Sequence, residues 1–362
     1  MSEFTLPLIE IIIGIILLFA GGEFFIQGSV ALSLMLGIPQ IVIGLTVVAL
    51  GTSSPELLVS LNSVLKGSDG LAVSNVIGSN IFNILVVLGI SSLIRPLKVK
   101  SRIVRRDVPL LIAISCAVWA MSSTGLLTWQ AGIFLIFCLI LNTIWEINTI
   151  NEKDEDIKTA EPEINDSLSK KNKFNIFGKL LIGVLLLGFG SNILVNGSRS
   201  LAILIGINET IIGLTIVATG TSLPELVTSI VAAFKGKTDL AIGNVIGSNL
   251  LNQLLILGSC TLFSGFEGLT INSDLIRTDL PIMVLTTFAC MPIFWTKGKI
   301  TRAEGFILLN IYGFYILDKI LLLSKFELLQ EFRLFILIYS TILFFVLFAK
   351  NKFKIIGFES ST

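Results

Sequence analysis

The stretch GLTVVALGTSSPELLVSLNSVLKGSDGLAVSNVIGSNIFNILVVLG occupies residues 44–89, and a second copy, GLTIVATGTSLPELVTSIVAAFKGKTDLAIGNVIGSNLLNQLLILG, occupies residues 213–258. The copies align without a gap at an offset of 169 residues, and 26 of the 46 positions are identical. The identities include Glu56 and Glu225, each a carboxylate in an otherwise apolar stretch. Because a carboxylate at membrane depth is costly, its recurrence indicates that the pair forms a functional site.

The composition is that of a polytopic membrane protein. The 362 residues are 53% hydrophobic and 14% charged, whereas a soluble protein has about 25% charged residues. Apolar runs long enough to cross the hydrocarbon layer predict eleven transmembrane helices. These runs lie at residues 5–25, 39–65, 70–94, 107–123, 126–147, 177–202, 208–234, 239–263, 278–296, 303–323 and 332–349.

The distribution of charge predicts the orientation in the membrane. With the N-terminus outside, the inside loops hold 20 Lys and Arg residues and the outside segments hold 6. The positive-inside rule therefore favours an outside N-terminus and a cytoplasmic C-terminus. Glu23 and Glu146 lie near the ends of predicted spans, and we expect both at the membrane interface.

The number of spans between the two copies predicts an inverted repeat. The chain crosses the membrane five times between Glu56 and Glu225, so the copies insert with opposite orientations, as in many secondary transporters. We predict an all-α fold with two inverted five-helix repeats (ten core helices) and one extra C-terminal helix. The predicted units are 1–147 (first repeat), 148–176 (polar cytoplasmic linker), 177–323 (second repeat) and 324–362 (extra helix and cytoplasmic tail). A regulatory ion-binding role for the linker acids remains an alternative.

The motif G-T-S-x-P-E ends in the glutamate of each copy. Proline lacks an N–H and clashes with the preceding turn, so we expect Pro55 and Pro224 to break their helices about four residues upstream. Carbonyls near Ala49–Thr52 and Ala218–Thr221 would then be free to bind a ligand. Broken backbone at this depth is tolerated where it lines a cavity or meets other protein.

The next helix of each copy carries a second polar set. Asn75, Ser79 and Asn83 are spaced to share one helix face, and Asn244, Ser248 and Asn252 repeat that stripe. All these groups present hard oxygens, which suit Na⁺, Ca²⁺ and Mg²⁺ rather than zinc or copper. The chain contains no histidine, which excludes histidine ligands and histidine acid–base chemistry.

Packing is the alternative interpretation of these polar residues, because Ser, Gly and Asn are common between membrane helices. The glutamates favour ion binding more strongly. A structural glutamate at membrane depth needs a basic partner, and the Lys and Arg residues lie in predicted loops or at span ends.

With both G-T-S-x-P-E and [GS]-N-x-I-G-S-N duplicated, the sequence resembles the cation/Ca²⁺ exchanger superfamily, and most of all its prokaryotic Na⁺/Ca²⁺ exchanger branch. The resemblance covers about residues 1–323. It implies a secondary transporter rather than an enzyme, which exchanges Na⁺ for Ca²⁺, usually three for one, by alternating access in a prokaryotic (inner) cell membrane. It implies no organic cofactor, no nucleic acid and no obligate protein partner.

Residue by residue, the resemblance implies that Glu56 and Glu225 are the central Ca²⁺ ligands. The other implied ligands are the side chains of Thr52, Ser53, Thr221, Ser222, Ser79, Ser248 and Asn83, and the carbonyl oxygens of Ala49 and Ala218 at flanking Na⁺ sites. Asn252 departs from the pattern, since close relatives often carry Asp there. With only two carboxylates, one Ca²⁺ gives a formal site charge of zero and three Na⁺ give +1, so exchange is expected to be electrogenic.

Three other functions remain open. An H⁺/Ca²⁺ or other divalent-cation antiporter would use the same fold. A passive cation channel is disfavoured, because inverted halves with ligands on broken helices do not form a continuous pore. An intramembrane hydrolase is also disfavoured, because no nucleophile–base pair or phosphate loop accompanies the two carboxylates.

Overall fold

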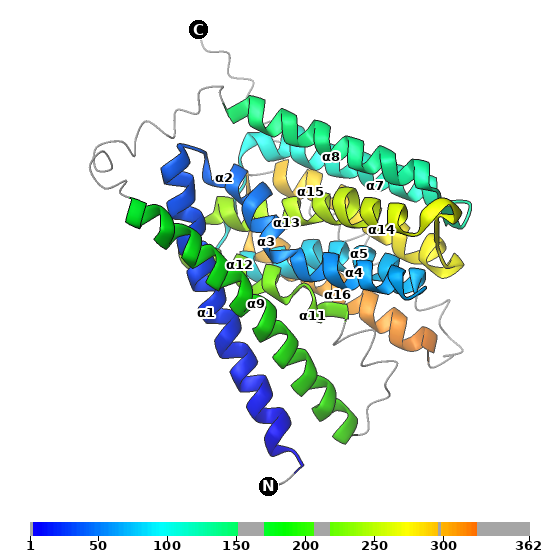
Figure 1. Cartoon of the computed structure of the whole chain (residues 1–362), viewed down its shortest axis with the longest axis horizontal. Coiled ribbons are helices and arrows are strands. Elements are labelled where there is room, and N and C mark those ends of the chain that lie inside the picture. Colours follow the sequence, from blue (N-terminus) through cyan, green and yellow to red (C-terminus); the bar gives the residue numbers. More distant parts are fainter. Residues whose placement is uncertain (1–2, 151–169, 206–217, 296–297, 324–362) are drawn as a thin grey trace.

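The computed structural model describes residues 3–150, 170–205, 218–295 and 298–323, and most of them are helical (Figure 1). Six of the described helices are long and apolar enough to cross a membrane, and a bent helix pair adds a seventh span. The predicted all-α membrane fold is confirmed. The predicted helix at 332–349 and most of the linker at 148–176 lie outside the described residues, and the unit boundaries stay predictions.

The first repeat contains α1 (Thr5–Leu36), α2 (Gln40–Ile43), η1 (Gly44–Val48), α3 (Ala49–Thr52), α4 (Ser54–Leu65), α5 (Asp69–Phe82), η2 (Asn83–Val87), α6 (Leu88–Ile94), β1 (Leu97–Lys98), η3 (Ile103–Asp107), α7 (Val108–Ser122), β2 (Leu126–Leu127) and α8 (Trp129–Ile150). The π-helical segments η1, η2 and η3 continue directly into the neighbouring α-helices.

The second repeat contains α9 (Lys170–Leu204), α11 (Ala218–Gly220), α12 (Leu223–Phe234), α13 (Thr238–Leu251), η6 (Asn252–Leu257), α14 (Gly258–Phe263), η7 (Gly265–Glu267), β3 (Leu269–Thr270), η8 (Leu275–Asp279), α15 (Leu280–Trp295), β4 (Lys299–Ile300) and α16 (Arg302–Leu323). The described elements follow the order of those in the first repeat.

The first helices of the two repeats, α1 and α9, pack along each other as an antiparallel pair (Figure 1). A Cβ atom added at Gly14, Gly21 or Gly28 would lie 2.7–2.9 Å from Leu194, Leu187 and Leu180, respectively. Glycines of α9 make the same close approach to α1 at Gly183, Gly190 and Gly197. Positions rise along one helix as they fall along the other, which is the relation that inverted repeats require.

The predicted end of the first span, at residue 25, was wrong, because α1 continues to Leu36. The apolar run is interrupted by Glu23 and Gln27. The helix nevertheless continues, because Phe25, Ile26, Gly28 and Ser29 are buried against the rest of the molecule. Packing thus overrides the local hydropathy at this point.

Two short antiparallel ribbons, which the sequence analysis did not predict, join the repeats. Strand β1 pairs with β4, with Leu97 opposite Ile300, and β2 pairs with β3, with Leu126 opposite Thr270. Each ribbon joins segments that the predicted span order places on the same side of the membrane. The contacts therefore agree with the predicted topology of the described spans.

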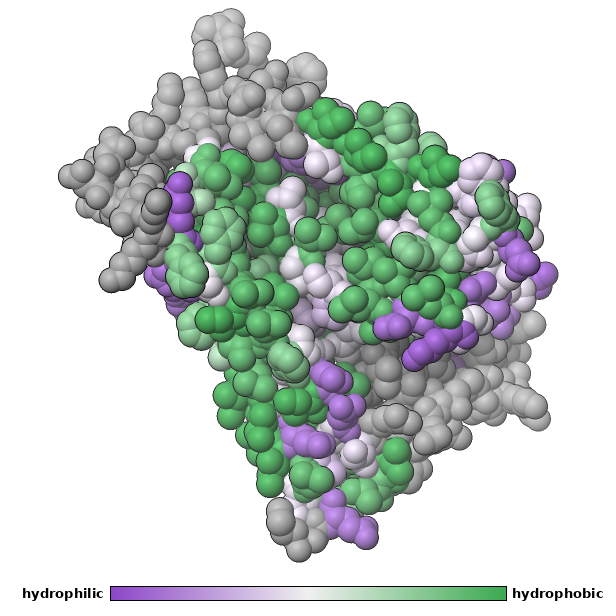
Figure 2. Space-filling model, viewed as in Figure 1, coloured by the Kyte–Doolittle hydropathy of each residue, from purple (hydrophilic) through white to green (hydrophobic). Residues whose placement is uncertain are grey.

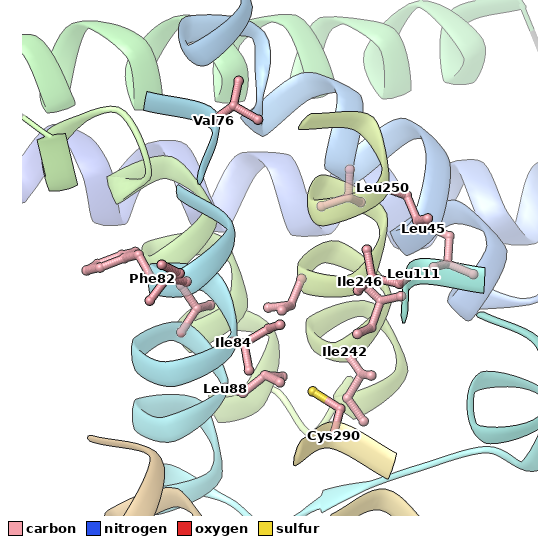
Figure 3. Close-up of a cluster of buried hydrophobic side chains, with 14 of the residues drawn as sticks. Leu45, Val76, Phe82, Ile84, Leu88, Leu111, Ile242, Ile246, Leu250 and Cys290 are labelled. Atoms are coloured by element: carbon pink, nitrogen blue, oxygen red, sulfur yellow. The ribbon is translucent and has the colours of Figure 1, made fainter. Parts of the chain in front are cut away.

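The centre of the molecule is formed by the third helix of each repeat. In the spans Asp69–Ile94 and Thr238–Phe263, 78% and 89% of an apolar 18-residue segment is buried inside the protein, against 33% for α1. Their apolar side chains, among them Ile84 and Ile246, belong to one buried cluster (Figure 3). Large apolar side chains are exposed along α1, α8 and α9, and hydrophobic residues cover much of the face shown in Figure 2. This distribution suits a lipid environment.

Candidate cation site

Each repeat has a helix break immediately before the motif glutamate. Helix α3 ends at Thr52 and α4 begins at Ser54, with a bend of 46° between the two halves of the span. The intervening Ser53 has φ −82° and ψ 5°, and Ser222 repeats this conformation with φ −89° and ψ 7°. The two copies of the motif therefore build the same local structure.

The prediction that the break lies about four residues upstream of the proline was wrong. Pro55 and Pro224 lie in the first turn of α4 and α12, where a missing N–H costs no hydrogen bond. The Ala49 carbonyl still accepts the Ser53 N–H at 2.9 Å. Ala218, the matching residue, is the first residue of α11.

The proline frees the carbonyl four residues before it, that of Gly51 or Gly220, because the amide that would pair with it is missing. In the second repeat this carbonyl accepts a hydrogen bond from the hydroxyl of Ser191 on α9. The position in α1 that matches Ser191 is Gly22, which has no hydroxyl to donate.

The two glutamates are fully buried in the first turns of α4 and α12, where a helix N-terminus stabilises negative charge. Each accepts a hydrogen bond from the serine hydroxyl at the helix break of the opposite repeat. Ser222 donates to Oε1 of Glu56 at 3.1 Å, and Ser53 donates to Oε1 of Glu225 at 2.8 Å. Among the described residues, no Lys or Arg pairs with either glutamate.

The threonines of the motif also reach across the repeat interface. Thr52 donates to Oδ1 of Asn244 at 3.0 Å, and Thr221 donates to Oδ1 of Asn75 at 3.1 Å. The amide of Asn75 donates to Ser60 at 3.0 Å, and that of Asn244 donates to Ser229 at 2.9 Å. Asn75 and Asn244 therefore brace the broken helices, and the side-chain oxygen of each already accepts one hydrogen bond.

The remaining predicted residues, Ser79, Ser248, Asn83 and Asn252, are also buried. The hydroxyls of Ser79 and Ser222 are hydrogen-bonded at 2.9 Å, and because Ser222 gives its single proton to Glu56, Ser79 is the donor. Asn83 and Asn252 each begin a π-helical segment, a feature frequent at functional sites. Of the predicted residues, only Ala218 has a side chain that the structure leaves undescribed.

Five buried oxygens among these residues have no hydrogen-bond partner in the part of the chain that the structure describes. They are the second oxygens of both glutamates (Oε2), the amide oxygens of Asn83 and Asn252, and the hydroxyl oxygen of Ser248. Buried polar atoms are almost always paired with protein, water or a ligand, so this set of unpaired oxygens is consistent with a bound cation. In the part of the chain that the structure describes, no group of three or more His, Cys, Asp or Glu residues could hold a metal ion.

Asn80 and Asn249, which are not among the predicted ligands, bond directly to this set. They lie on α5 and α13, and both are fully buried. They are identical in the two copies, and this signal was available. The direction in which their side chains point depends on how α5 and α13 dock and could not be predicted.

Glu146 lies at the end of the candidate span Trp129–Glu146, so its place at the membrane interface stays a prediction, and its side chain is buried, at 5% exposed. It pairs with Arg102 and with Arg106, the latter at 2.7 Å. Glu23 lies within α1 rather than at its end, and its side chain pairs with Lys235 at 2.5 Å. Both acids have basic partners, whereas Glu56 and Glu225 have none among the described residues.

Comparison with known proteins identifies the family. The model of the sodium/calcium exchanger protein family matches residues 6–147 and residues 175–321. The chain belongs to this family. Sodium/calcium exchangers are membrane ion transporters rather than a family of catalytic enzymes, and they need no organic cofactor. The chain is therefore a cation/Ca²⁺ exchanger and an integral membrane protein.

Individual exchangers and membrane proteins match most of the chain. It is 30% identical over 342 residues to the sodium/calcium exchanger MaX1 of Methanosarcina acetivorans, with 85% of this chain and 97% of the relative covered. It is 32% identical over 297 residues to the inner membrane protein YrbG of Escherichia coli, with 80% and 88% covered. The solved structure of the sodium-calcium exchanger NCX_Mj, soaked with 10 mM Na⁺ and zero Ca²⁺, superposes with a TM-score of 0.74 at 28% identity, with 86% and 98% covered.

Proposed function

We propose that this exchanger is an electrogenic antiporter that moves Na⁺ and Ca²⁺ in opposite directions through one shared site. The observation that supports this most strongly is the set of five buried oxygens, all on predicted ligands, that have no partner among the described residues. Two of them are carboxylate oxygens, two are amide oxygens and one is a hydroxyl oxygen. Hard cations such as Na⁺ and Ca²⁺ take such oxygens as ligands, and Ca²⁺ prefers about six to eight of them.

The proposed ligands are the predicted set. Glu56 and Glu225 bind Ca²⁺ centrally, with support from Thr52, Thr221, Ser53, Ser222, Ser79, Ser248, Asn83 and Asn252, while the carbonyls of Ala49 and Ala218 contribute to flanking Na⁺ positions. The cation takes the place of missing basic partners, because two buried carboxylates need compensating charge.

The charge of the site determines the coupling that we propose. Two carboxylates give −2, so one Ca²⁺ neutralises the site and three Na⁺ leave +1. Because both ions need Glu56 and Glu225, occupancy by one lowers the affinity for the other. Moving an empty pair through an occluded state is costly, so the protein changes conformation only when an ion is bound.

We propose that the two repeats, 1–147 and 177–323, form the two halves of an alternating-access transporter. The antiparallel pair α1 and α9 is the moving element, and its glycine contacts pack the two helices closely against each other, which favours movement of the pair as one unit. We further propose an outside N-terminus and a cytoplasmic C-terminus in a prokaryotic cell membrane, from the distribution of basic residues.

The experiment that tests this function is ⁴⁵Ca²⁺ uptake into proteoliposomes, with Na⁺ and H⁺ gradients imposed separately. We expect uptake when Na⁺ is loaded inside and absent outside, and no uptake with a pH gradient alone. Uptake driven by the pH gradient without Na⁺ would instead identify an H⁺/Ca²⁺ antiporter. Single-channel currents in planar bilayers would identify a channel.

A further inference from the structure

Asn80 and Asn249 connect the two repeats immediately beside the proposed ligands Asn83 and Asn252. Each is fully buried, and each bonds to the asparagine ligand of the opposite repeat. An asparagine side chain has an oxygen that can bind a cation and an amino group that cannot. The two groups are similar in size, so their positions in a site are determined by their hydrogen-bond partners.

The orientation of Asn83 follows from a backbone carbonyl, which can only accept hydrogen bonds. The carbonyl oxygen of Asn80 accepts the amino group of Asn249 at 3.1 Å. This directs Oδ1 of Asn249 to Asn83, from which it accepts the amino group at 3.1 Å. The oxygen of Asn83 is thereby the atom without a partner.

The orientation of Asn252 follows from a thioether sulfur, which also can only accept. The sulfur of Met283 accepts the amino group of Asn80 at 3.5 Å. Oδ1 of Asn80 therefore faces Asn252 and accepts its amino group at 3.3 Å. The oxygen of Asn252 is again left buried and unpaired.

We propose that Asn80 and Asn249 are positioning residues, which hold the amide ligands of the opposite repeat with oxygen rather than nitrogen toward the cation. This inference rests on the proposed function, in which Asn83 and Asn252 are ligands. One chain of hydrogen bonds starts at the carbonyl of Asn80 and the other at the sulfur of Met283. Both end with the oxygen of an asparagine ligand unpaired. Asn249 orients Asn83, and Asn80 orients Asn252.

The assignment predicts a specific pattern of rescue. Asn249→Ala removes the acceptor that holds the amino group of Asn83, so the Ca²⁺ affinity should fall about tenfold, the effect of losing roughly one hydrogen bond to the ligand. Aspartate has two equivalent oxygens and needs no orienting partner. In an Asn83→Asp background, Asn249→Ala should therefore have little further effect on Ca²⁺ affinity, whereas in an Asn252→Asp background its full effect should remain.

Asn80→Ala is the matched variant, because it removes the side chain but leaves the carbonyl oxygen that binds Asn249. Its loss of Ca²⁺ affinity should be rescued by Asn252→Asp and not by Asn83→Asp. A purely structural role for either asparagine would lower the affinity by the same factor in both aspartate backgrounds.

The measurement is equilibrium binding of ⁴⁵Ca²⁺ to the full chain in detergent without Na⁺, with the thermal unfolding midpoint measured for each variant. If one alanine variant does not fold, the other still tests its own half of the pattern. Equal losses in both backgrounds, or no loss at all, would overturn the assignment. If Glu56→Gln abolishes binding while neither alanine variant changes it, the positioning role fails and the proposed function stands. If the unmodified chain binds no Ca²⁺, the proposed function itself fails.

Discussion

The two repeats make matching polar contacts at the centre of the molecule. They make different polar contacts near the ends of α8 and α16. At the centre, Ser53 and Ser222 each donate to the glutamate of the other repeat, and Thr52 and Thr221 each donate to an asparagine of the other repeat. The distances in the matching pairs differ by no more than 0.3 Å. A site that must offer the same ligands from either side is expected to have this symmetry.

Toward the ends, the same positions carry different charges. In the first repeat, Glu146 on α8 pairs with two arginines next to Asp107. In the second repeat, Lys319 on α16 pairs at 2.6 Å with Asp279, which matches Asp107 in the sequence. The helix pair is joined in both cases, with opposite polarity. The comparison teaches that the polar side-chain contacts are more nearly symmetric where the ions are proposed to bind than at the ends of α8 and α16.

The largest expected effect tests the symmetry of the site. Glu56→Gln and Glu225→Gln should each reduce Na⁺-dependent ⁴⁵Ca²⁺ uptake at least about 100-fold, because an uncompensated buried charge costs about 3–5 kcal/mol. The two losses should be similar. The exposed Glu267→Gln serves as the control and should keep full uptake. Full activity in either of the first two variants would remove that glutamate from the site.

The next effect concerns the ion pairs of Glu146 and Lys319, which differ between the repeats, and it is measured as a change in stability rather than in transport. Glu146→Gln leaves Arg102 and Arg106 without their main partner and should lower the free energy of unfolding by about 3 kcal/mol. Lys319→Met should cost less, because Asp279 keeps the hydrogen bond from the hydroxyl of Tyr315 at 2.8 Å. Thermal unfolding in detergent measures both. The reverse order of the two variants would contradict the comparison.

A smaller effect should reveal where the site itself departs from symmetry. Ser222 bonds to both Glu56 and Ser79, whereas Ser248, the counterpart of Ser79, has an unpaired hydroxyl. Ser53→Ala and Ser222→Ala should each raise the KM for Ca²⁺ by about tenfold, as expected for one hydrogen bond to a charged group. The increase should be larger for Ser222→Ala. Equal KM values for the two variants would show that the contact between Ser222 and Ser79 does not affect Ca²⁺ binding.

The smallest effect concerns the balance between conformations. The pair of Glu23 and Lys235 has no ionic counterpart, because Asn192 occupies the position that matches Glu23. Glu23→Gln should therefore shift the conformational equilibrium away from the conformation in which this pair forms. The shift should be about twofold to fivefold, the usual contribution of an exposed ion pair. The ratio of the Ca²⁺ KM values at the two membrane faces reports this shift.

Asn192→Glu is the matched variant for this prediction. Lys66 matches Lys235 in the sequence, so the new carboxylate would pair with Lys66 in the opposite conformation of the transport cycle. It should change the ratio of KM values in the reverse direction. A change in the same direction for both variants would contradict a role for the ion pair in the balance between conformations.

Most helices could be predicted from the sequence, because apolar runs and the internal repeat both locate them. The ends at Leu65, Ile94 and Phe263 agree with the predicted spans to within a residue. The length of α1 could not be predicted, because Glu23 and Gln27 break the apolar pattern while packing keeps the helix intact. The ribbons joining the repeats were also missed, because their strands have only two residues each.

The proximity of the candidate residues could be predicted from duplication, since inverted copies bring Glu56 and Glu225 to one interface. The network around them could not. Asn80 and Asn83 bond to residues more than 160 positions away in the chain, and such contacts depend on how α5 and α13 dock. The partners of Glu146 were missed for a related reason, because Arg102 and Arg106 lie on a different helix.

The charge moved in each exchange cycle tests most directly the central claim that two buried carboxylates bind either one Ca²⁺ or three Na⁺. Na⁺-loaded proteoliposomes are given external ⁴⁵Ca²⁺ while K⁺ and valinomycin set the membrane potential. One net positive charge leaves the vesicle with each Ca²⁺ that enters, so an inside-positive potential should accelerate uptake and an inside-negative potential should slow it. Uptake that does not depend on the potential would contradict the account.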